Sequence, residues 1–273
     1  MKYSVLMAVY KNDDAEFLRR ALASIYEDQT KKPDEIVVVF DGPLTDSLYN
    51  VLNEFAEDKA DVVRYLCEKE NKGLGEALRI GSQLCTGDYI FRMDADDISH
   101  PERFEKQSAY VEAHPEVDVL GTDIAEFYES HLEEKLRIRS CPTAHGEIVK
   151  MGKKRNPMNH VSVCIKKEAL MQCGGYESLF LLEDYLLWLK MIAAGRVLAN
   201  VNEPLVYVRI GNGFHSKRGA KVRISGWKVI QKYMLDHKMI TKSEARRNMF
   251  NIRFFTCCPV WLRKIMYDKI LRK

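Results

Sequence analysis

The sequence lacks the features that identify membrane-spanning, secreted or repetitive proteins. Among its 273 residues, no apolar run approaches the roughly 18 residues that a membrane-spanning helix needs. The first ten residues contain one lysine and enter a strand-like pattern directly, so we expect no signal peptide. There is no internal repeat and no low-complexity segment, which excludes solenoids and disordered tracts.

Cysteine is present, but not in an arrangement typical of metal sites or disulfide frameworks. The seven cysteines are odd in number, and none forms a CxxC pair. We therefore expect a reducing, cytoplasmic compartment, in which most of these cysteines are small buried hydrophobic residues.

The chain has enough apolar residues to bury a large core, and its charge is unevenly distributed. Hydrophobic residues make up 46% and charged residues 30%, which excludes disorder and suits one large α/β domain with an appendage. The formal net charge is only +3. However, residues 217–273 hold 16 basic and three acidic residues, whereas residues 1–216 hold 26 basic and 36 acidic ones. The C-terminal segment is thus strongly basic and the remainder is acidic.

The first 98 residues alternate between strand and helix patterns. Strands are predicted at Ser4–Val9, Ile36–Phe40, Val62–Leu66 and Tyr89–Met93, and helices around 18–25, 48–55 and 74–84. Such alternation predicts βαβ units and a mostly parallel, doubly wound sheet.

The rest of the chain is more mixed. Helices are predicted from Pro101 through Val111 and at Glu183–Ala194, and the pattern from Lys217 to the end is helical. Short strands are predicted at Val117–Leu120, Ile124–Tyr128, Val161–Ile165, Val197–Val201 and Leu205–Ile210.

Polar residues follow three of the predicted strands. These are Tyr10, Asp41 and the run that starts at Asp94. In open α/β sheets, ligands bind at the carboxyl ends of the strands, so these side chains are candidates for binding a nucleotide and its diphosphate. For Asp41 alone, the start of a turn is the competing interpretation.

The pair Asp94 and Asp96 is the sharpest local feature. Two acids that flank one small residue, just after a buried strand, suit a hard divalent cation such as Mg²⁺ or Mn²⁺ that bridges protein and phosphate. The alternative is an acidic turn that caps the next helix.

In this context the chain resembles the family 2 inverting glycosyltransferases, which have the GT-A fold and assemble bacterial polysaccharides. The resemblance covers roughly residues 1–215 and lies in an ordered set of motifs. These are residues 4–10, 33–39 and 71–75, the stretch from Gly87 to Asp97, and Cys173–Tyr176 followed by Glu183–Trp188. The ordered set is more specific than any one of its parts.

The resemblance implies a role for each matching residue. Asp184 would be the catalytic base, Asp96 would bind the metal on the diphosphate, and Asp94 would approach the ribose or donor sugar. Residues that would contact the UDP-sugar are Ala8, Tyr10, Asp41, Lys72, Gly73, Asp94 and Ala95. The implied division is a GT-A catalytic domain at 1–215, with a nucleotide-binding half at 1–98 and an acceptor-binding half at 99–215, followed by a basic helical segment at 216–273.

The chemistry of sugar transfer also supports Asp184 as the base, independently of the resemblance. Displacement of UDP from an anomeric carbon needs the leaving-group charge neutralised and an acceptor hydroxyl deprotonated. Glu183 and Asp184 open a predicted helix, where backbone N–H groups favour an ionised carboxylate. The competing interpretation is that both acids simply interact with the helix dipole.

Several further residues are weaker candidates. The acceptor site is predicted to include Glu183, Tyr185, Trp188, His160 and Arg155. For Tyr185 and Trp188, core packing at helical spacing is the alternative, and for Arg155 it is a solvated loop. His215, in a glycine-rich loop, is a candidate third metal ligand.

The basic segment has three possible roles. Its amphipathic helices, with Trp227 and Trp261 beside lysine and arginine, suit an anionic membrane surface. Nucleic acid is the other polyanion, but no nucleic-acid-binding motif accompanies the charge, so we expect none. The third role is a packed appendage with a solvated basic face. We favour the membrane, which places the protein peripherally on the inner face of the plasma membrane.

Together these observations predict a metal-dependent inverting enzyme that moves a hexose from a UDP-sugar to a lipid-diphosphate-linked saccharide in surface polysaccharide assembly. The resemblance favours galactose as the sugar, with glucose and N-acetylhexosamines open. The alternatives are a glycoside hydrolase, which would also use two carboxylates, and a non-catalytic basic protein that binds membrane or nucleic acid.

Overall fold

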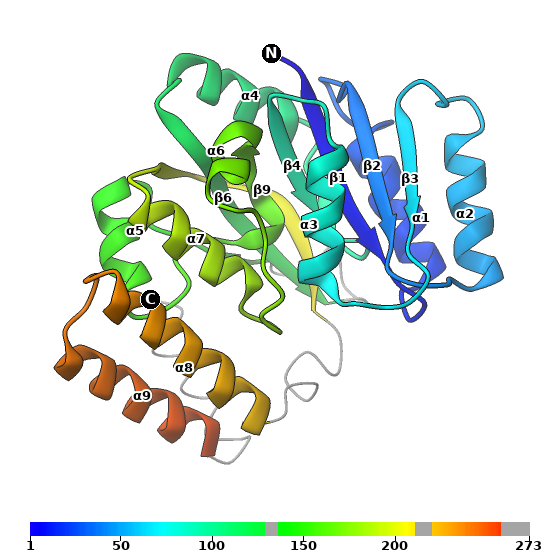
Figure 1. The fold of residues 1–273 in the computed structure, drawn as a ribbon. Helices are drawn as coiled ribbons and strands as arrows, with labels where there is room; N and C mark the ends of the chain where they lie inside the picture. The colour runs from blue at the N-terminus through cyan, green and yellow to red at the C-terminus, as the bar shows by residue number, and fades with distance from the viewer. Residues whose placement is uncertain (129–135, 211–219, 258–273) are drawn as a thin grey trace.

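A computed structural model describes residues 1–128, 136–210 and 220–257 (Figure 1). Within these residues, nine strands form one sheet in the order β3-β2-β1-β4-β8-β6-β9-β5, with β7 paired to β6. The strands are β1 (Tyr3–Val9), β2 (Glu35–Phe40), β3 (Val63–Cys67), β4 (Tyr89–Met93), β5 (Ile98–Ser99), β6 (Val117–Tyr128), β7 (Arg137–Arg139), β8 (Cys164–Lys166) and β9 (Val197–Ile210).

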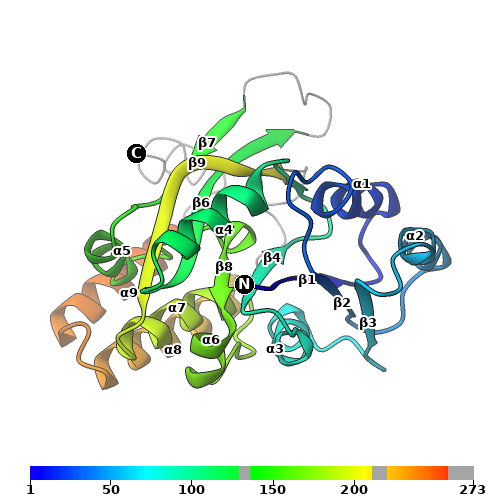
Figure 2. The ribbon, with the colours of Figure 1, turned by 90° about the horizontal axis from the view of Figure 1, so that it is seen from above.

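The helices lie on both sides of this sheet (Figure 2). They are α1 (Ala15–Ile25), α2 (Asp46–Ala56), α3 (Leu74–Leu84), α4 (Arg103–Ala113), α5 (His145–Gly152), α6 (Lys167–Gln172), α7 (Glu183–Ala193), α8 (Ala220–Asp236) and α9 (Lys242–Cys257). A short 3₁₀ helix, His160–Ser162, precedes β8.

The expected α/β fold with a mostly parallel central sheet is confirmed. Strands β3, β2, β1 and β4 pair in parallel, and helices α1, α2 and α3 make the crossover connections from β1 to β2, from β2 to β3 and from β3 to β4. Antiparallel pairing enters with β8, which lies between β4 and β6. All six residues of β2 are buried, as expected for a strand that helices cover on both faces.

Two predicted pairs of strands are single long strands. β6 runs unbroken through Gly121–Asp123, and β9 runs through Asn202–Pro204, where the sequence predicts gaps. The two strands pair in parallel with register shifts near Asp123, so irregular residues are accommodated without ending either strand.

Two hydrophobic cores lie on opposite faces of the sheet. One packs α1, α2 and α4 against the sheet, with Leu22, Leu52 and Phe104 among its residues. The other packs α3, α5, α6 and α7 on the opposite face, with Leu78 and Trp188. The helices therefore hold the strand ends rigidly from both sides.

The C-terminal helices form a third, smaller core. Ile230 and Met234 of α8 and Ala245 of α9 pack with Tyr185 and Leu189 of α7. Trp227 packs here too, with its ring centroid 5.4 Å from that of Tyr185. The basic segment is thus fastened to α7. Trp261 lies outside the described residues. Among the residues that the structure describes, no helix has the length and apolarity needed to cross a membrane.

Candidate active site

Three polar residues come together where neighbouring parallel strands end. Val9 pairs with Phe40, and Met7 pairs with Met93, so β1, β2 and β4 end at the same edge of the sheet. Tyr10, Asp41 and Asp94 follow these strands directly. Desolvation, together with the negative charges of Asp13 and Asp96, raises the pKa of the Tyr10 hydroxyl. Tyr10 therefore lies in the electrostatic field of the acidic loop after β4.

The Asp41 carboxylate organises the loop that leads into α3. Asp41 is buried, and its Oδ1 accepts the backbone N–H of Lys72 at 2.7 Å while its Oδ2 accepts that of Gly73 at 3.0 Å. Gly42 allows the loops to meet, because an added Cβ there would lie 2.7 Å from the backbone nitrogen of Asn71. Its φ of 86° also favours glycine. The structure therefore brings Asp41, Lys72 and Gly73 together, as predicted.

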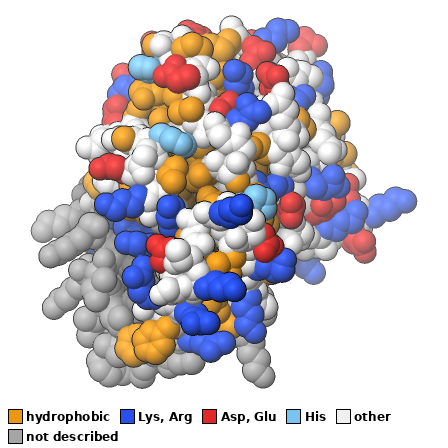
Figure 3. Space-filling model, turned by 60° about the vertical axis from the view of Figure 1, so that its left-hand side comes forward, with side chains coloured by type: hydrophobic (Ala, Val, Ile, Leu, Met, Phe, Trp, Pro, Cys, Tyr) orange, Lys and Arg blue, Asp and Glu red, His pale blue; other side chains and the backbone are white. Residues whose placement is uncertain are grey.

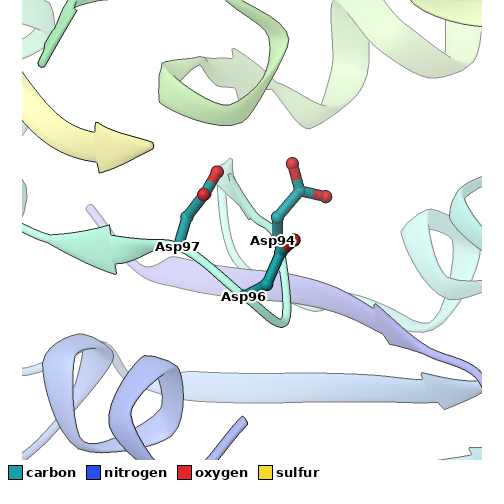
Figure 4. Close-up of side chains that lie close together, drawn as sticks. All are labelled: Asp94, Asp96 and Asp97. Atoms are coloured by element: carbon teal, nitrogen blue, oxygen red, sulfur yellow. The ribbon is translucent and has the colours of Figure 1, made fainter. Parts of the chain in front are cut away.

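The loop after β4 carries three carboxylates that lie close together (Figure 4). One carboxylate oxygen from each of Asp94, Asp96 and Asp97 lies within 4.8 Å of the others. Carboxylate oxygens are the donors that Mg²⁺ and Mn²⁺ prefer, so these residues fit a hard divalent cation. The Asp97 carboxylate is buried and accepts the backbone N–H of Arg209 at 2.8 Å, which ties the loop to β9.

The crowding of negative charge raises the proton affinity of this loop. Asp96 stays in contact with solvent, but the protein around its carboxyl and the charge of Asp94 raise its pKa to about 6. Burial and the charges of Asp96 and Asp94 raise the pKa of Asp97 well above its ordinary value. A bound cation would relieve this repulsion and return both carboxyls to the ionised form.

A buried arginine lies beneath the acidic residues. Arg92, within β4, forms an ion pair with Asp94 through Nη1, and its guanidinium is almost completely buried. Its positive charge lowers the pKa values of Asp96, Glu183 and Asp184 against the stronger effect of burial. The Arg92 guanidinium thus acts electrostatically on the carboxylates after β4 and on those at the start of α7.

Asp184 lies in the first turn of α7, as predicted. Its Oδ1 accepts the backbone N–H of Tyr185 at 2.7 Å, and its Oδ2 accepts Nδ2 of Asn156 at 2.5 Å. Burial raises the pKa of the Asp184 carboxyl, while these hydrogen bonds and the positive charges of Arg92 and Arg139 oppose that rise. The pKa of Asp184 stays raised, but these contacts limit the rise and favour the ionised form that a general base requires.

Glu183 lies next to Asp184 in the first turn of α7 and faces the start of α3. Burial and the negative charge of Asp184 raise the pKa of Glu183 to about 7. A Cβ added at Gly75, in the first turn of α3, would lie 3.3 Å from Cβ of Glu183. The starts of α3 and α7 therefore meet, and Gly75 permits this close approach.

Three of the predicted acceptor-site residues are core or supporting residues. Tyr185 and Trp188 are completely buried, which favours core packing over the alternative of lining the acceptor site. The Oη of Tyr185 donates to the carbonyl of Gly152 at 2.6 Å. Nε2 of His160 lies 3.0 Å from Oη of Tyr176, and burial and Arg92 hold the pKa of His160 well below its ordinary value. His160 is therefore a neutral hydrogen-bonding partner in the wall behind the site.

The remaining predicted residues are placed as follows. Ala8 is half-buried in β1, Ala95 is buried within the acidic loop, and Arg155 is half-buried beside Asn156. His215 lies outside the described residues.

Sequence reasoning missed Arg92, Asn156 and Arg209. Arg92 had a usable signal, because a charged residue inside an otherwise apolar strand needs a buried partner. Arg209 lies on β9 with its guanidinium 3.8 Å from the centre of the Phe17 ring, and its Nε donates to the carbonyl of Asp96 at 3.1 Å. The contacts of Asn156 and Arg209 are long-range, so nothing local in the sequence indicates them.

Comparison with known proteins gives a consistent assignment. The sequence profile described as Glycosyl transferase family 2 matches residues 4–180. The amylovoran biosynthesis glycosyltransferase AmsE of Erwinia amylovora is 36% identical, and the alignment covers 98% of each chain. A UDP-Gal:alpha-D-GlcNAc-diphosphoundecaprenol beta-1,3-galactosyltransferase of Escherichia coli is 34% identical over 100% of this chain and 97% of its own.

A solved structure shares the fold at low sequence identity. The crystal structure of S. aureus TarS 1–349 in complex with UDP-GlcNAc has a TM-score of 0.69 and 16% identity, covering 99% of this chain and 76% of that one. This likeness supports the GT-A fold, and the two relatives align over almost their whole length. With these relatives, and with most of the α/β domain inside the family profile, the chain belongs to glycosyltransferase family 2.

Proposed function

We propose that this protein is an inverting, metal-dependent glycosyltransferase that moves a hexose from a UDP-sugar to a lipid-diphosphate-linked saccharide. The observation that carries the proposal is the arrangement of carboxylates around Arg92. Asp94 and Asp96 lie at a strand end suited to a nucleotide diphosphate, and Asp184 lies at a helix start that stabilises its ionised form. Family membership favours transfer over hydrolysis and over a non-catalytic role.

The reaction requires one displacement at the anomeric carbon. The acceptor hydroxyl oxygen forms a bond to that carbon as the bond to the UDP oxygen breaks, and UDP leaves with the electron pair. The hydroxyl proton passes to Asp184. A single displacement with one base and no enzyme nucleophile inverts the anomeric configuration.

The donor half is assigned to residues 1–98 and the acceptor half to residues 99–215. Tyr10, Asp41 and the loop that Asp41 holds would bind the uridine, and the loop after β4 would meet the diphosphate. The acids Asp94, Asp96 and Asp97 would hold Mn²⁺ or Mg²⁺, which neutralises charge on the departing diphosphate. His215 remains a candidate additional ligand.

The favoured substrates follow from the relatives. The Escherichia coli relative is named as a transferase of galactose from UDP-Gal to a GlcNAc-diphospholipid. We propose UDP-galactose as the donor and a lipid-diphosphate-linked amino sugar as the acceptor, in the assembly of a surface polysaccharide.

The C-terminal helices supply a surface for an anionic membrane. Lysine and arginine side chains gather over this part of the molecule (Figure 3). On α9, Phe250 and Phe254 are 69% and 51% exposed, one helical turn apart, with the exposed Arg246, Arg247 and Arg253 beside them. Exposed aromatic side chains flanked by arginine favour the interface of an anionic lipid surface. We therefore propose a peripheral position at the inner face of the plasma membrane.

The deciding experiment measures ligand binding and transfer separately. We expect UDP with Mn²⁺ to raise the melting temperature, and UDP-galactose to be consumed only when a GlcNAc-diphospholipid acceptor is present. NMR of the product should show inversion. Absence of stabilisation by UDP plus metal, or release of free hexose without acceptor, would contradict the proposal.

The test of membrane binding uses substitutions instead of a truncation, because removing α8 would expose the buried side chains of Tyr185 and Leu189. The double variant Arg246→Gln/Arg247→Gln should bind vesicles containing anionic lipid about 30-fold more weakly, since each of the two juxtamembrane charges contributes about 1 kcal/mol. Equal, salt-insensitive binding by both forms would count against the membrane role.

A further inference from the structure

Asn156 lies in the loop after α5, and its side chain contacts the Asp184 carboxylate. Its Nδ2 donates to Asp184 Oδ2 at 2.5 Å, while Oδ1 of the same carboxylate accepts the backbone N–H of Tyr185 at 2.7 Å. Each carboxylate oxygen thus receives one N–H donor. This fixes the plane of the carboxylate and leaves lone pairs that can accept a proton.

The orientation of the Asn156 amide is itself determined. Its Oδ1 accepts the backbone N–H of Met158 at 3.2 Å, so the amide nitrogen faces Asp184. The opposite orientation would lose this bond and turn a carbonyl oxygen towards a carboxylate. Pro157, which is buried, also restricts the backbone of the residue before it to extended conformations.

Two helices hold the loop that carries Asn156. Oη of Tyr185, on α7, donates to the carbonyl of Gly152 at 2.6 Å. Nδ2 of the buried Asn248, on α9, donates to the carbonyl of Lys153 at 2.8 Å. The loop is therefore fixed relative to the helix that carries Asp184, which a positioning contact requires.

The charged groups around Asp184 come from several elements. Arg92 on β4 and Arg139 on β7 favour its ionised form. The Asp184 charge in turn helps to raise the pKa values of three neighbouring groups, which are Glu183, Tyr185 and the Tyr176 hydroxyl in the preceding loop. Burial raises the pKa of Asp184, and the Asn156 hydrogen bond is the largest effect that opposes this rise.

We propose that Asn156 is a positioning residue that keeps the Asp184 carboxylate ionised and oriented to take the proton from the acceptor hydroxyl. This inference rests on the proposed role of Asp184 as the base. It assigns a role in catalysis to the loop between α5 and the 3₁₀ helix, which carries Asn156.

The test is the pH dependence of kcat and of kcat/KM for the acceptor in Asn156→Ala, Asn156→Ser and Asn156→Asp. A lost hydrogen bond to a charged group should move the acid limb of the Ala variant up by about one pH unit and lower kcat at neutral pH about tenfold or more. The serine hydroxyl should restore part of the shift. The aspartate variant should move the limb furthest, because two carboxylates then compete for one proton.

The donor-side readouts should stay unchanged, with the affinity for UDP plus Mn²⁺ within about twofold of the unsubstituted protein. Asn200→Ala is the matched control, because Asn200 is a buried asparagine whose side chain likewise donates a hydrogen bond, here to the carbonyl of Pro142 at 2.7 Å. It should lower the melting temperature without moving the acid limb.

Folded Asn156→Ala and Asn156→Ser proteins with an unshifted acid limb would overturn the inference, whatever their kcat. Asp184→Asn separates this failure from failure of the base assignment. If Asp184→Asn retains normal transfer, the proposed base is wrong. If it is inactive while the Asn156 variants keep an unshifted profile, only the positioning role fails.

Discussion

The proposed donor side of the site, with Asp41 and Asp94–Asp97, and the proposed base side, with Glu183 and Asp184, hold their carboxylates in different ways. On the donor side, Asp41 and Asp97 sit at strand ends and accept backbone N–H groups from neighbouring segments. On the base side, Asp184 sits in the first turn of a helix and is held partly by the side chain of Asn156. These strand-end carboxylates are therefore fixed by the backbone, whereas Asp184 receives one of its two hydrogen bonds from a side chain that a substitution can remove.

The largest expected effect comes from a substitution that removes the proposed base and leaves the donor side intact. Asp184→Asn keeps the shape of the side chain but removes the proton acceptor, so kcat should fall by about 10²–10⁴. Because the donor side is intact, UDP with Mn²⁺ should still raise the melting temperature normally. Steady-state kinetics and thermal unfolding check both parts. Glu177→Gln is the control, since Glu177 lies on the surface nearby and pairs with Lys190. Near-normal transfer by Asp184→Asn would remove Asp184 from the mechanism.

The second largest effect comes from a substitution that weakens metal binding on the donor side. Asp96→Asn removes one charged ligand from the acidic loop, and a metal on a diphosphate contributes several kcal/mol, so kcat/KM should fall about 10²-fold. The stabilisation by UDP should also lose its dependence on Mn²⁺. Asp88→Asn is matched to it, because Asp88 precedes the same strand at its opposite end and accepts the N–H of Lys2 at 2.8 Å. If Asp96→Asn bound UDP and Mn²⁺ like the unsubstituted protein, the metal assignment would fail.

The same contrast explains which features could be predicted from the sequence. Strand and helix periodicity and the acids directly after β4 are local, so the sequence predicts the parallel half of the sheet and places Asp41, Asp94 and Asp96 at one edge. The contact of Asn156 with Asp184 joins residues 28 positions apart on different elements. No local pattern encodes such a contact, because the folding of the whole second half creates it.

The prediction was weakest where irregular residues interrupt an apolar pattern. Asn202, Glu203 and Pro204 predict a gap between two strands, yet β9 continues through them. Pairing with β6, which shifts register near Asp123, provides the hydrogen bonds that local propensity does not. Trp227 was a candidate for membrane contact, but its ring packs against Tyr185 and stabilises the third core instead.

A third prediction concerns the anchoring of the donor side. The carboxylate of Asp41 accepts hydrogen bonds from the backbone N–H groups of Lys72 and Gly73. In Asp41→Asn, the NH₂ group of the amide would face one of these N–H donors and that hydrogen bond would be lost. The free energy of unfolding should fall by about 1–3 kcal/mol and UDP affinity about tenfold, because the loop before α3 loosens. Chemical denaturation and UDP titration measure the two. Asp34→Asn, at the other end of β2, keeps one amide oxygen that can still accept the N–H of Tyr3, and it should leave UDP affinity unchanged. Equal effects of both substitutions would mean that Asp41 has no special role in the donor loop.

The smallest expected effect is a change in the pH dependence of kcat, which distinguishes titration of Glu183 on the base side from titration of Asp96 on the donor side. Glu183 has a pKa raised to about 7, so it gains negative charge as the pH rises through neutrality and makes the neighbouring Asp184 a stronger base. We expect kcat to increase about threefold through this range, above a separate acid limb that reports Asp184 itself. Glu183→Gln should abolish the inflection near pH 7 and keep the acid limb, because Glu183 is already protonated there. Glu147→Gln, in the first turn of α5, is the matched control and should keep both features. If the inflection survived in Glu183→Gln, it would belong instead to the donor side, where burial and the charge of Asp94 raise the pKa of Asp96 to about 6. The Asp96→Asn profile would then identify it, since a group on the donor side would titrate differently as the Mn²⁺ concentration is changed, whereas Glu183 would not.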